Sequence, residues 1–402
     1  MSERPRVALF VESSSEFGRM VLSGIRSYIK ANTSWSIYLQ QRDLNTRLPN
    51  WLSHWQGGGI ISRSTTPEYA SIAKKMRIPL VDLTDRYGDL ELPQIWPDHE
   101  RIGSMAAEHL LEREFHHFAF AGYEDEVWSS MRQASFTKRI QEAGYQVHQF
   151  VSHWDLQPGT SWDDEYSSLV RWLEQLPKPV GIMAANDVRG QQILDVCCEI
   201  NLAVPEQSAV IGCDNDGLRC ELCDPPLTSV IPNAEQIGYQ SARLLDELMT
   251  AQRRGISLQR ERIVIPPTGI YLRKSTDILA IDDPEIAEAV RVIRQRALSG
   301  LKVEDVLKTV AISRSTLERG VRKYLKRSPQ AEIRRVQLAH ACELLANTDM
   351  TLPEIASRCG FVHPEYFSVV FKRQLNLTPG QYRQDHSQES GSVWTGPPVI
   401  PD

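Results

Sequence analysis

The chain of 402 residues predicts an α/β region of two doubly wound lobes, followed by an all-helical domain with two helix-turn-helix units. Over roughly the first 270 residues, short apolar runs alternate with amphipathic stretches, as in parallel sheets whose strands are joined by helices. After residue 284 only the helical period remains. At about 150 residues per domain, the length also requires two or three domains.

The composition is that of a globular protein, with 41% hydrophobic and 24% charged residues. No apolar stretch approaches the roughly 18 residues that a membrane span needs. The apolar run near the N-terminus is too short for a secretory signal. Seven cysteines, an odd number, suit a reducing compartment better than a disulfide framework. We therefore expect a cytoplasmic protein with no membrane partner.

The first domain is expected at residues 1–272. Its strands are predicted at residues 7–11, 36–39, 59–62, 78–82, 118–121, 181–184 and 209–212. Its helices are predicted at residues 18–30, 101–113, 129–143, 166–175, 189–200 and 234–253. Because the strands are continuously apolar, both faces of each sheet should be covered by helices. In such folds ligands bind beyond the carboxyl ends of the strands.

A polar linker is predicted at residues 273–284, a helical domain at 285–385 and a flexible tail at 386–402. The helices of this domain are expected at residues 284–298, 303–310, 313–325, 331–346, 352–359 and 364–375. Residues 285–385 contain 17 Lys and Arg against 11 Asp and Glu, a net charge of +6, so the rest of the chain carries −12. A basic domain on an acidic body indicates a module that binds a polyanion.

The helical domain contains an internal repeat with a period of about 50 residues. Leu317, Val321 and Leu325 correspond to Phe367, Phe371 and Leu375, and a Ser/Thr-Pro pair follows each set. Each unit has a short helix, a tight turn and a longer helix, which is the helix-turn-helix pattern of DNA-binding proteins. Gly360 permits the left-handed turn of the second unit, and Ser313 is a plausible N-cap in the first.

The outward faces of the two recognition helices supply the candidate DNA-binding residues. These side chains can donate to phosphates or to base edges. They are Arg314, Ser315, Thr316, Arg319, His363, Glu365, Tyr366, Ser368, Lys372 and Arg373.

Residues 348–361 (TDMTLPEIASRCGF), with Tyr366-Phe367, Phe371-Lys372-Arg373, Thr378-Pro379 and Tyr382-Arg383, resemble the signature of AraC-type regulators. This resemblance covers about 100 residues. It implies that both recognition helices enter successive segments of the major groove. The turn glycines that the family would place before the two Ser/Thr-Pro pairs are replaced here by Lys326 and Asn376.

Polar and aromatic residues gather in the α/β part where strands should end. Carboxylates, amides, a guanidinium and an aromatic face are the groups that bind a neutral polyol. The candidate ligand-binding residues are Glu12, Phe17, Arg19, Asp98, Trp128, Arg132, Asn186, Asp187, Asp214 and Asn215. Any one of these acids could instead be a helix N-cap, but several at successive strand ends favour a binding site.

The segments 184–187 (AAND), 210–215 (VIGCDN), 225–230 (PPLTSV) and 238–245 (GYQSARLL) resemble the effector domain of Lac-repressor-type regulators. That domain is similar to periplasmic sugar-binding proteins, so the resemblance implies two periplasmic-binding-protein-like lobes that close on a sugar. It places Asp98, Arg132, Asn186, Asp187 and Asp214 in sugar-contacting positions. An N-terminal DNA-binding headpiece is not expected, because the first strand begins near residue 6. A Lac-type effector domain followed by an AraC-type domain is the arrangement of the xylose-operon activators, and the whole chain resembles that family.

These patterns predict a regulator that binds promoter DNA in response to a monosaccharide, xylose or a related sugar. We expect a homodimer that contacts RNA polymerase if it is an activator. The alternative is a cytoplasmic solute-binding or sugar-modifying protein with a helical appendage. No enzyme is predicted, because no catalytic motif is found in a suitable context. Neither a cofactor nor a metal ion is expected, since no second pair of ligands follows Cys220 and Cys223 closely.

Overall fold

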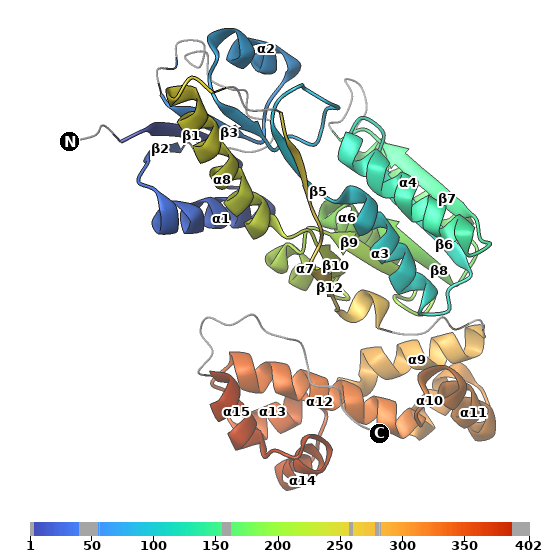
Figure 1. The fold of residues 1–402 in the computed structure, drawn as a ribbon. Helices are drawn as coiled ribbons and strands as arrows, with labels where there is room; N and C mark the ends of the chain where they lie inside the picture. The colour runs from blue at the N-terminus through green and yellow to red at the C-terminus, as the bar shows by residue number, and fades with distance from the viewer. Residues whose placement is uncertain are drawn as a thin grey trace. The chain divides into compact units, whose positions relative to one another are not determined.

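The computed structural model describes residues 4–39, 55, 57–154, 162–256, 260–277, 281 and 283–387. These residues form two compact units (Figure 1). The first comprises Met1–Glu112, His116–Ile200 and Val210–Thr276, and the second comprises Asp277–Asp402 together with Arg113–Phe115 and Asn201–Ala209. None of the helices in the described ranges is long and apolar enough to cross a membrane. The predicted tail beyond residue 387, and residues 278–280 and 282 of the predicted linker, lie outside the described residues.

The first unit contains two six-stranded sheets. The first sheet has the order β11-β5-β4-β3-β1-β2, and its described strand pairs are parallel. Its strands are β1 (Arg6–Phe10), β2 (Ser36–Leu39), β3 (Gly59–Ser62), β4 (Leu80–Asp82), β5 (Gln94–Pro97) and β11 (Arg262–Ile265). The helices of this lobe are α1 (Glu16–Asn32), α2 (Pro67–Met76) and α8 (Ala234–Arg253).

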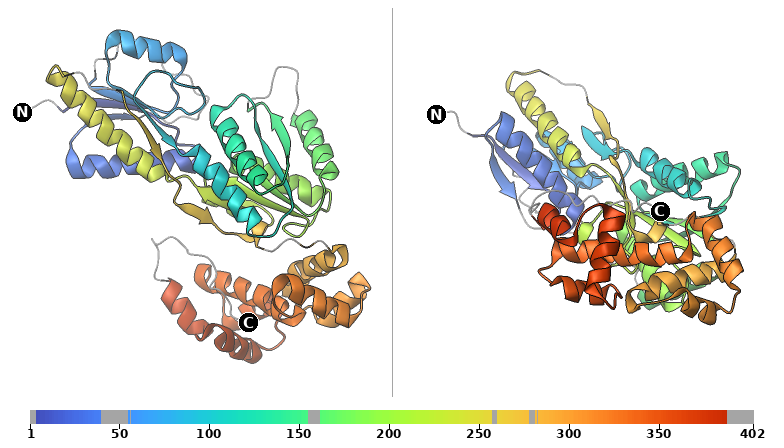
Figure 2. Two further views of the ribbon diagram at one scale, coloured as in Figure 1. Left: turned by 45° about the vertical axis from the view of Figure 1, so that its right-hand side comes forward. Right: turned by 90° about the horizontal axis from the view of Figure 1, so that it is seen from below.

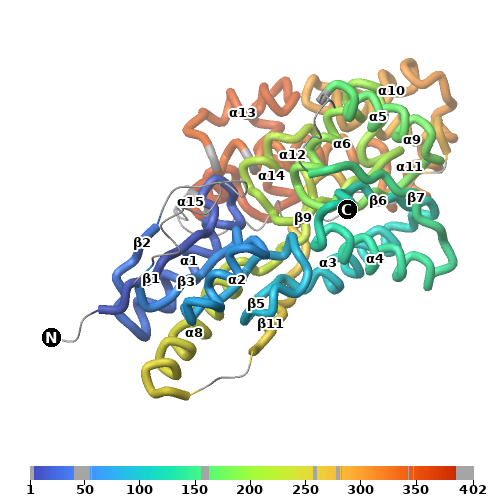
Figure 3. The backbone as a smooth tube through the Cα atoms, turned by 90° about the horizontal axis from the view of Figure 1, so that it is seen from above, coloured from blue at the N-terminus to red at the C-terminus, as the bar shows by residue number. Residues whose placement is uncertain are grey.

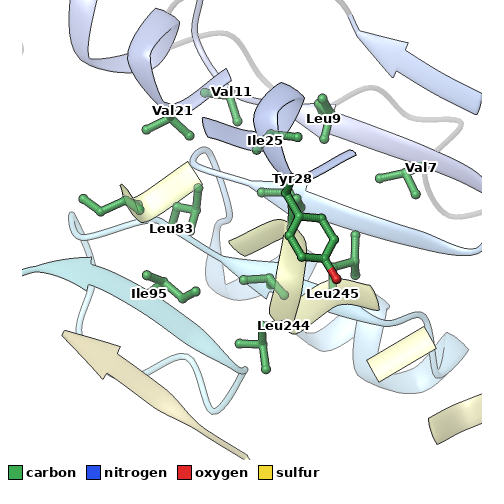
Figure 4. Close-up of a cluster of buried hydrophobic side chains, with 14 of the residues drawn as sticks. Val7, Leu9, Val11, Val21, Ile25, Tyr28, Leu83, Ile95, Leu244 and Leu245 are labelled. Carbon is green, nitrogen blue, oxygen red and sulfur yellow. The ribbon is translucent and has the colours of Figure 1, made fainter. Parts of the chain in front are cut away.

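The core of this lobe lies between the sheet and helices α1 and α8. Figure 4 shows side chains of β1, α1 and α8 gathered in one cluster with Leu83, directly after β4, and Ile95 of β5. The two helices touch backbone to backbone, because a Cβ at Gly24 would lie 1.9 Å from the Glu235 carbonyl oxygen. A Cβ at Gly238 would be equally close to the carbonyl oxygen of Val21. Only glycine allows this approach.

The second sheet has the order β12-β10-β9-β8-β6-β7, with β12 antiparallel to β10. Its strands are β6 (His117–Tyr123), β7 (Val147–Ser152), β8 (Val180–Ala184), β9 (Ser208–Cys213), β10 (Thr228–Ile231) and β12 (Gly269–Tyr271). The helices of this lobe are α3 (His99–Leu111), α4 (Val127–Glu142), α5 (Trp162–Gln175), α6 (Asp187–Glu199) and the short α7 (Gly217–Leu222). The chain passes between the sheets after β5, β10 and β11, so β5 and β11 lie side by side although they are far apart in sequence (Figure 3).

The prediction of two doubly wound lobes is confirmed, but five strands were not predicted. These are β5, β7, β10, β11 and β12. Strand β7 lies at a sheet edge and mixes polar with apolar residues, so it carries no continuous apolar run, and β11, at the edge of the other sheet, has an apolar run of only three residues. Strand β5 is buried, but its sequence QIWP contains Gln and Pro and therefore lacks the continuous apolar run by which the other buried strands were predicted.

Residues 283–387 of the second unit are all-helical, as predicted. Its helices are α9 (Pro284–Arg296), α10 (Val303–Val310), α11 (Arg314–Leu325), α12 (Pro329–Asn347), α13 (Leu352–Arg358), α14 (Pro364–Leu375) and α15 (Pro379–Ser387). Two hydrophobic clusters form in it, one around α9–α11 and the other around α13–α15, and α12 contributes to both. Figures 1 and 2 show α12 between the two groups of helices. Its 19 residues make a rod of about 28 Å.

Candidate functional site

Charged side chains gather at the carboxyl ends of strands in the first unit. Arg63, directly after β3, forms an ion pair with Glu12, which follows β1. Its guanidinium also lies 3.9 Å from Asp85 and 4.3 Å from the centre of the Phe17 ring. Glu12 is fully buried, and Ser15 donates to its Oε1 at 3.0 Å. The other carboxylate oxygen, Oε2, has no hydrogen-bond partner among the described residues.

A second chain of contacts runs through Asp85, His99 and Arg132. Arg132 Nε donates to His99 Nδ1 at 3.3 Å. Since arginine has no acceptor, Nδ1 must be unprotonated, and the ring carries its proton on Nε2, which lies 3.2 Å from Asp85 Oδ2. Burial lowers the pKa of His99 and outweighs the opposing effect of Asp85. Burial alone would raise the pKa of Asp85, but His99 and the charges of Arg63 and Arg132 lower it to about 2.

Asp214 follows β9 and has the unusual backbone angle φ of +109°. The sparsely populated conformation is held by its neighbours, because Asp187 Oδ2 accepts from the backbone N–H of Asp216 at 2.8 Å. The hydroxyl of Ser229 accepts from the backbone N–H of Asn215, the residue directly after Asp214, at 2.9 Å. The same hydroxyl donates to Asp187 Oδ1 at 2.6 Å. Asp187 therefore holds this loop. Burial and the charge of Asp214 raise the pKa of Asp187 above its ordinary value.

The loop presents Asp214 as the most accessible carboxylate of the cluster. Its side chain is 30% exposed, whereas those of Glu12 and Asp85 are 0% and 5% exposed. Arg132 lies 3.6 Å from Asp214 Oδ1 and donates to the carbonyl oxygen of Ala185 at 2.5 Å. Burial raises the pKa of Asp214, and the charge of Arg132 opposes that shift.

Aromatic rings line the same region. The guanidinium carbon of Arg132 lies 5.0 Å from the centre of the Trp128 ring. Trp128 Nε1 donates to Glu126 at 2.7 Å. Tyr123 and Trp154 pack against it at 5.9 Å between ring centres. Such rings can cover the apolar face of a sugar while the charged groups bind its hydroxyls.

The structure brings together Glu12, Phe17, Trp128, Arg132, Asp187 and Asp214 from the predicted set. Asp98 and Asn186 are N-caps of α3 and α6 and accept from backbone N–H groups at 2.8 and 3.0 Å. Asn215 accepts from Arg273 at 3.0 Å. Arg19 is exposed and donates to the carbonyl oxygens of its own loop, so no described contact joins it to the buried cluster.

Sequence reasoning missed Arg63, Asp85 and His99. The signal that could have found them is the one used for the other candidates, because Arg63 directly follows the strand predicted at 59–62. Asp85 comes three residues after the next strand, and His99 is the neighbour of Asp98. Their importance depends on the order of strands in the sheet, which periodicity does not reveal.

In the second unit, α11 is the first recognition helix. Its N-cap is Ser313, as predicted, which accepts from the N–H of Thr316 at 3.1 Å and also contacts the hydroxyl of Ser315. Arg314 forms an exposed ion pair with Glu304 at 3.1 Å. The Arg319 side chain is exposed and makes no hydrogen bond or ion pair with any other described residue, so its guanidinium is available to a nucleic acid.

The second recognition helix is α14. His363, Glu365, Lys372 and Arg373 are exposed on it, and none forms an ion pair within the described part of the chain. Ser368 is half-buried and donates to the Pro364 carbonyl oxygen at 3.1 Å.

Tyr366 accepts from Arg334 of α12 at 3.3 Å, and the same guanidinium lies 5.0 Å from the centre of the Phe361 ring. This predicted DNA-binding residue therefore also fixes α14 against α12.

Four residues that end helices or turns of the two helix-turn-helix units have left-handed backbone conformations. Gly360 ends the α13 turn with φ of +75°, as predicted, whereas Ala311 takes the equivalent position in the first unit with φ of +58°. Lys326 and Asn376, which replace the expected glycines, both have φ of +58° and end α11 and α14. The backbone therefore keeps the turn geometry of a glycine at a site where lysine is strained.

Three family models match the chain. They are the XylR N-terminal domain over residues 6–101, a periplasmic binding protein-like domain over residues 107–276 and a helix-turn-helix domain over residues 306–385. The xylose operon regulatory protein of Escherichia coli (strain K12) is 31% identical over 396 residues, which are 96% of this chain and 99% of that protein. The corresponding protein of Haemophilus influenzae is 30% identical over 94% of this chain and 98% of its own length. A solved structure of the xylose-binding transcription activator xylR matches with a TM-score of 0.79 and 30% identity, covering 96% of this chain and all of the other.

Two lobes of the periplasmic-binding-protein type, joined to an AraC-type pair of helix-turn-helix units, define a sugar-responsive transcription regulator that binds DNA. The similarity extends over nearly the full length of both chains. The chain belongs to the family of xylose operon regulatory proteins.

Proposed function

We propose that the polar cluster of the first unit binds a monosaccharide, xylose or a related sugar, and that binding controls activation of a promoter. The single observation that carries this proposal is Oε2 of Glu12, a buried carboxylate oxygen with no donor among the described residues. An unpaired buried carboxylate oxygen is costly, and a sugar hydroxyl would satisfy it. The names of the relatives, which refer to xylose, agree with this assignment.

The proposed ligand contacts divide by role. Glu12 and Asp214 accept from hydroxyls, Arg63 and Arg132 donate to sugar oxygens, and Trp128 covers the ring. Asp187 acts through the 214–216 loop that it holds. Phe17, Arg19, Asp98, Asn186 and Asn215 complete the proposed binding set.

The two lobes offer the means of response. Glu16 of α1 accepts from the N–H of Gly217 in the second lobe at 2.8 Å. The charge of Asp214 in the second lobe also contributes to raising the pKa of Arg63 in the first. A sugar that contacts both lobes favours one arrangement of them over others, which is the thermodynamic requirement for sensing.

We further propose that the protein is a cytoplasmic, non-catalytic regulator that acts as a homodimer on promoter DNA and contacts RNA polymerase. The relatives are transcription regulators, and one solved relative is titled an activator. The domains proposed are residues 1–272 for the sugar, 273–284 as linker, 285–385 for DNA and 386–402 as tail. Arg314, Ser315, Thr316, Arg319, His363, Glu365, Ser368, Lys372 and Arg373 are proposed to face DNA, with Tyr366 beside them.

The test is calorimetry of the full chain with D-xylose, L-arabinose, D-ribose, D-glucose and D-galactose. We expect one of these sugars to bind, and Asp214→Asn to weaken its binding about 10- to 150-fold, the loss for one charged hydrogen bond. Asparagine also tolerates positive φ, so the loop is preserved. Glu12→Gln, which removes the charge but keeps the shape, should weaken binding in the same direction.

The matched control is Glu247→Gln on α8, which makes the same change of carboxylate to amide at an exposed ion pair with Arg243. It should bind sugar like the wild type. If Asp214→Asn and Glu12→Gln also bind like the wild type, the sugar lies elsewhere. If no sugar binds the wild-type chain, the proposed effector class is wrong.

A further inference from the structure

One exposed valine lies on the outward face of α14, and a second precedes the helix. Val362 and Val369 are 85% and 64% exposed, although valine is usually buried. Val369 shares one face of α14 with Glu365 and Lys372, at spacings of four and three residues, whereas Val362 lies before the N-cap His363. The opposite face is formed by Phe367 and Phe371, which pack in the core.

The internal repeat gives an independent comparison. Helices α11 and α14 each have 12 residues and are offset by 50 positions, so Val369 has the place that Arg319 has in the first unit. Both side chains are exposed. One position of the same scaffold therefore presents a guanidinium in the first unit and a branched hydrocarbon in the second.

The surroundings of Val369 are those of a DNA-facing surface. Lys372 and Arg373 are exposed about one turn further along the helix and have no ion-pair partner in the described part of the chain. These cations match the phosphates that flank a major groove. Valine has neither donor nor acceptor, and the apolar group that bases present in the major groove is the C5 methyl of thymine.

We infer that Val369 is a specificity-determining residue that contacts a thymine methyl group under α14. Arg319 is at the matching position of α11 and suits guanine, whose O6 and N7 accept from a guanidinium. The two half-sites covered by one chain therefore differ in sequence at this position. The inference rests on the DNA-binding function and not on the identity of the sugar.

The test replaces thymine by deoxyuridine, which lacks the methyl group. The probes are duplexes selected from a random pool by the full-length wild-type chain, in the presence and absence of D-xylose. We expect one thymine in the selected site at which this replacement weakens wild-type binding about fourfold, the effect of one buried methyl group. The Val369→Ala variant should bind the thymine and deoxyuridine duplexes with nearly equal affinity. The substitution and the loss of the methyl group remove the same contact, so their effects do not add.

Two controls separate the contact from general damage. Val264→Ala makes the same substitution at an exposed valine of β11 and should keep the fourfold loss. Lys372→Ala should weaken binding to all duplexes and reduce the salt dependence by about one unit, while Val369→Ala should leave the salt dependence unchanged.

The inference is overturned if Val369→Ala and the wild type lose the same affinity at every thymine, which would assign the exposed Val369 to a protein partner. It is also overturned if deoxyuridine has no effect at any position, or if no duplex is enriched from the pool.

Discussion

Replacement of Glu332 by glutamine should destabilise the helical unit by about 3 kcal/mol at neutral pH. The Glu332 side chain is 1% exposed, and its carboxylate accepts from Arg335 at 2.8 and 2.9 Å. Arg294 of α9 lies 3.3 Å from this carboxylate, and Arg327, in the turn that follows α11, lies 3.5 Å from it. One carboxylate of α12 therefore links α9 and this turn to α12. Burial raises the pKa of Glu332, but the hydrogen bonds of Arg335 and the charges of Arg294 and Arg327 outweigh it and lower the pKa from 4.5 to about 2.

The magnitude follows from the difference between folded and unfolded pKa values. A decrease of about 2.5 units corresponds to about 3 kcal/mol of stability. Because the folded pKa lies below the unfolded one, this contribution is complete above pH 4.5 and is lost as the pH falls toward 2. Glutamine cannot balance the three guanidinium charges at any pH.

The assay is hydrogen exchange of the α12 amides in the full chain, measured by mass spectrometry at pH 7. A decrease of about 3 kcal/mol in opening free energy accelerates the slowest amides about 150-fold. None of the nine tryptophans lies within residues 285–385, so tryptophan fluorescence provides a separate check that the α/β unit is intact. Glu304→Gln, at an exposed ion pair with Arg314, is the matched control and should change exchange little. The reasoning is refuted if Glu332→Gln exchanges like this control.

Two further predictions concern the helical unit and its assembly. Gly360→Ala should destabilise the second helix-turn-helix unit by at least about 2 kcal/mol, because φ is +75° and the new Cβ would lie 2.6 Å from the backbone nitrogen of Gly300. Gly380→Ala, where a Cβ meets nothing within 4 Å, is the control; equal denaturation midpoints for the two variants would contradict the clash. We also expect two copies of the chain to bind a duplex that contains two repeated operator half-sites, since linked contacts raise affinity. Light scattering that shows a one-to-one complex at full affinity would refute the dimer.

Much of the candidate site follows from local rules, but its central contacts do not. Asp98 and Asn186 could be placed at helix N-termini, because a cap depends on residues two or three positions away. The pairing of Glu12 with Arg63 depends on β1 and β3 being neighbours in the sheet. The role of Asp187 depends on Ser229, which lies 42 residues further along the chain.

The sequence by itself determined seven of the strands, most of the helices, the two-lobed class, the duplicated helix-turn-helix and the outward faces of α11 and α14. These features follow from the spacing of apolar residues within one helix or strand, so neighbouring residues are enough to specify them. The tertiary structure alone decided which strand ends share an edge, that Arg63, Asp85 and His99 join the buried cluster, and that Asp187 holds the loop of Asp214. It also decided that Lys326 and Ala311 adopt left-handed conformations without glycine. The physical reason is that such contacts depend on strand order and on packing between segments far apart in the chain, where the burial of a whole core outweighs the local preference of one residue.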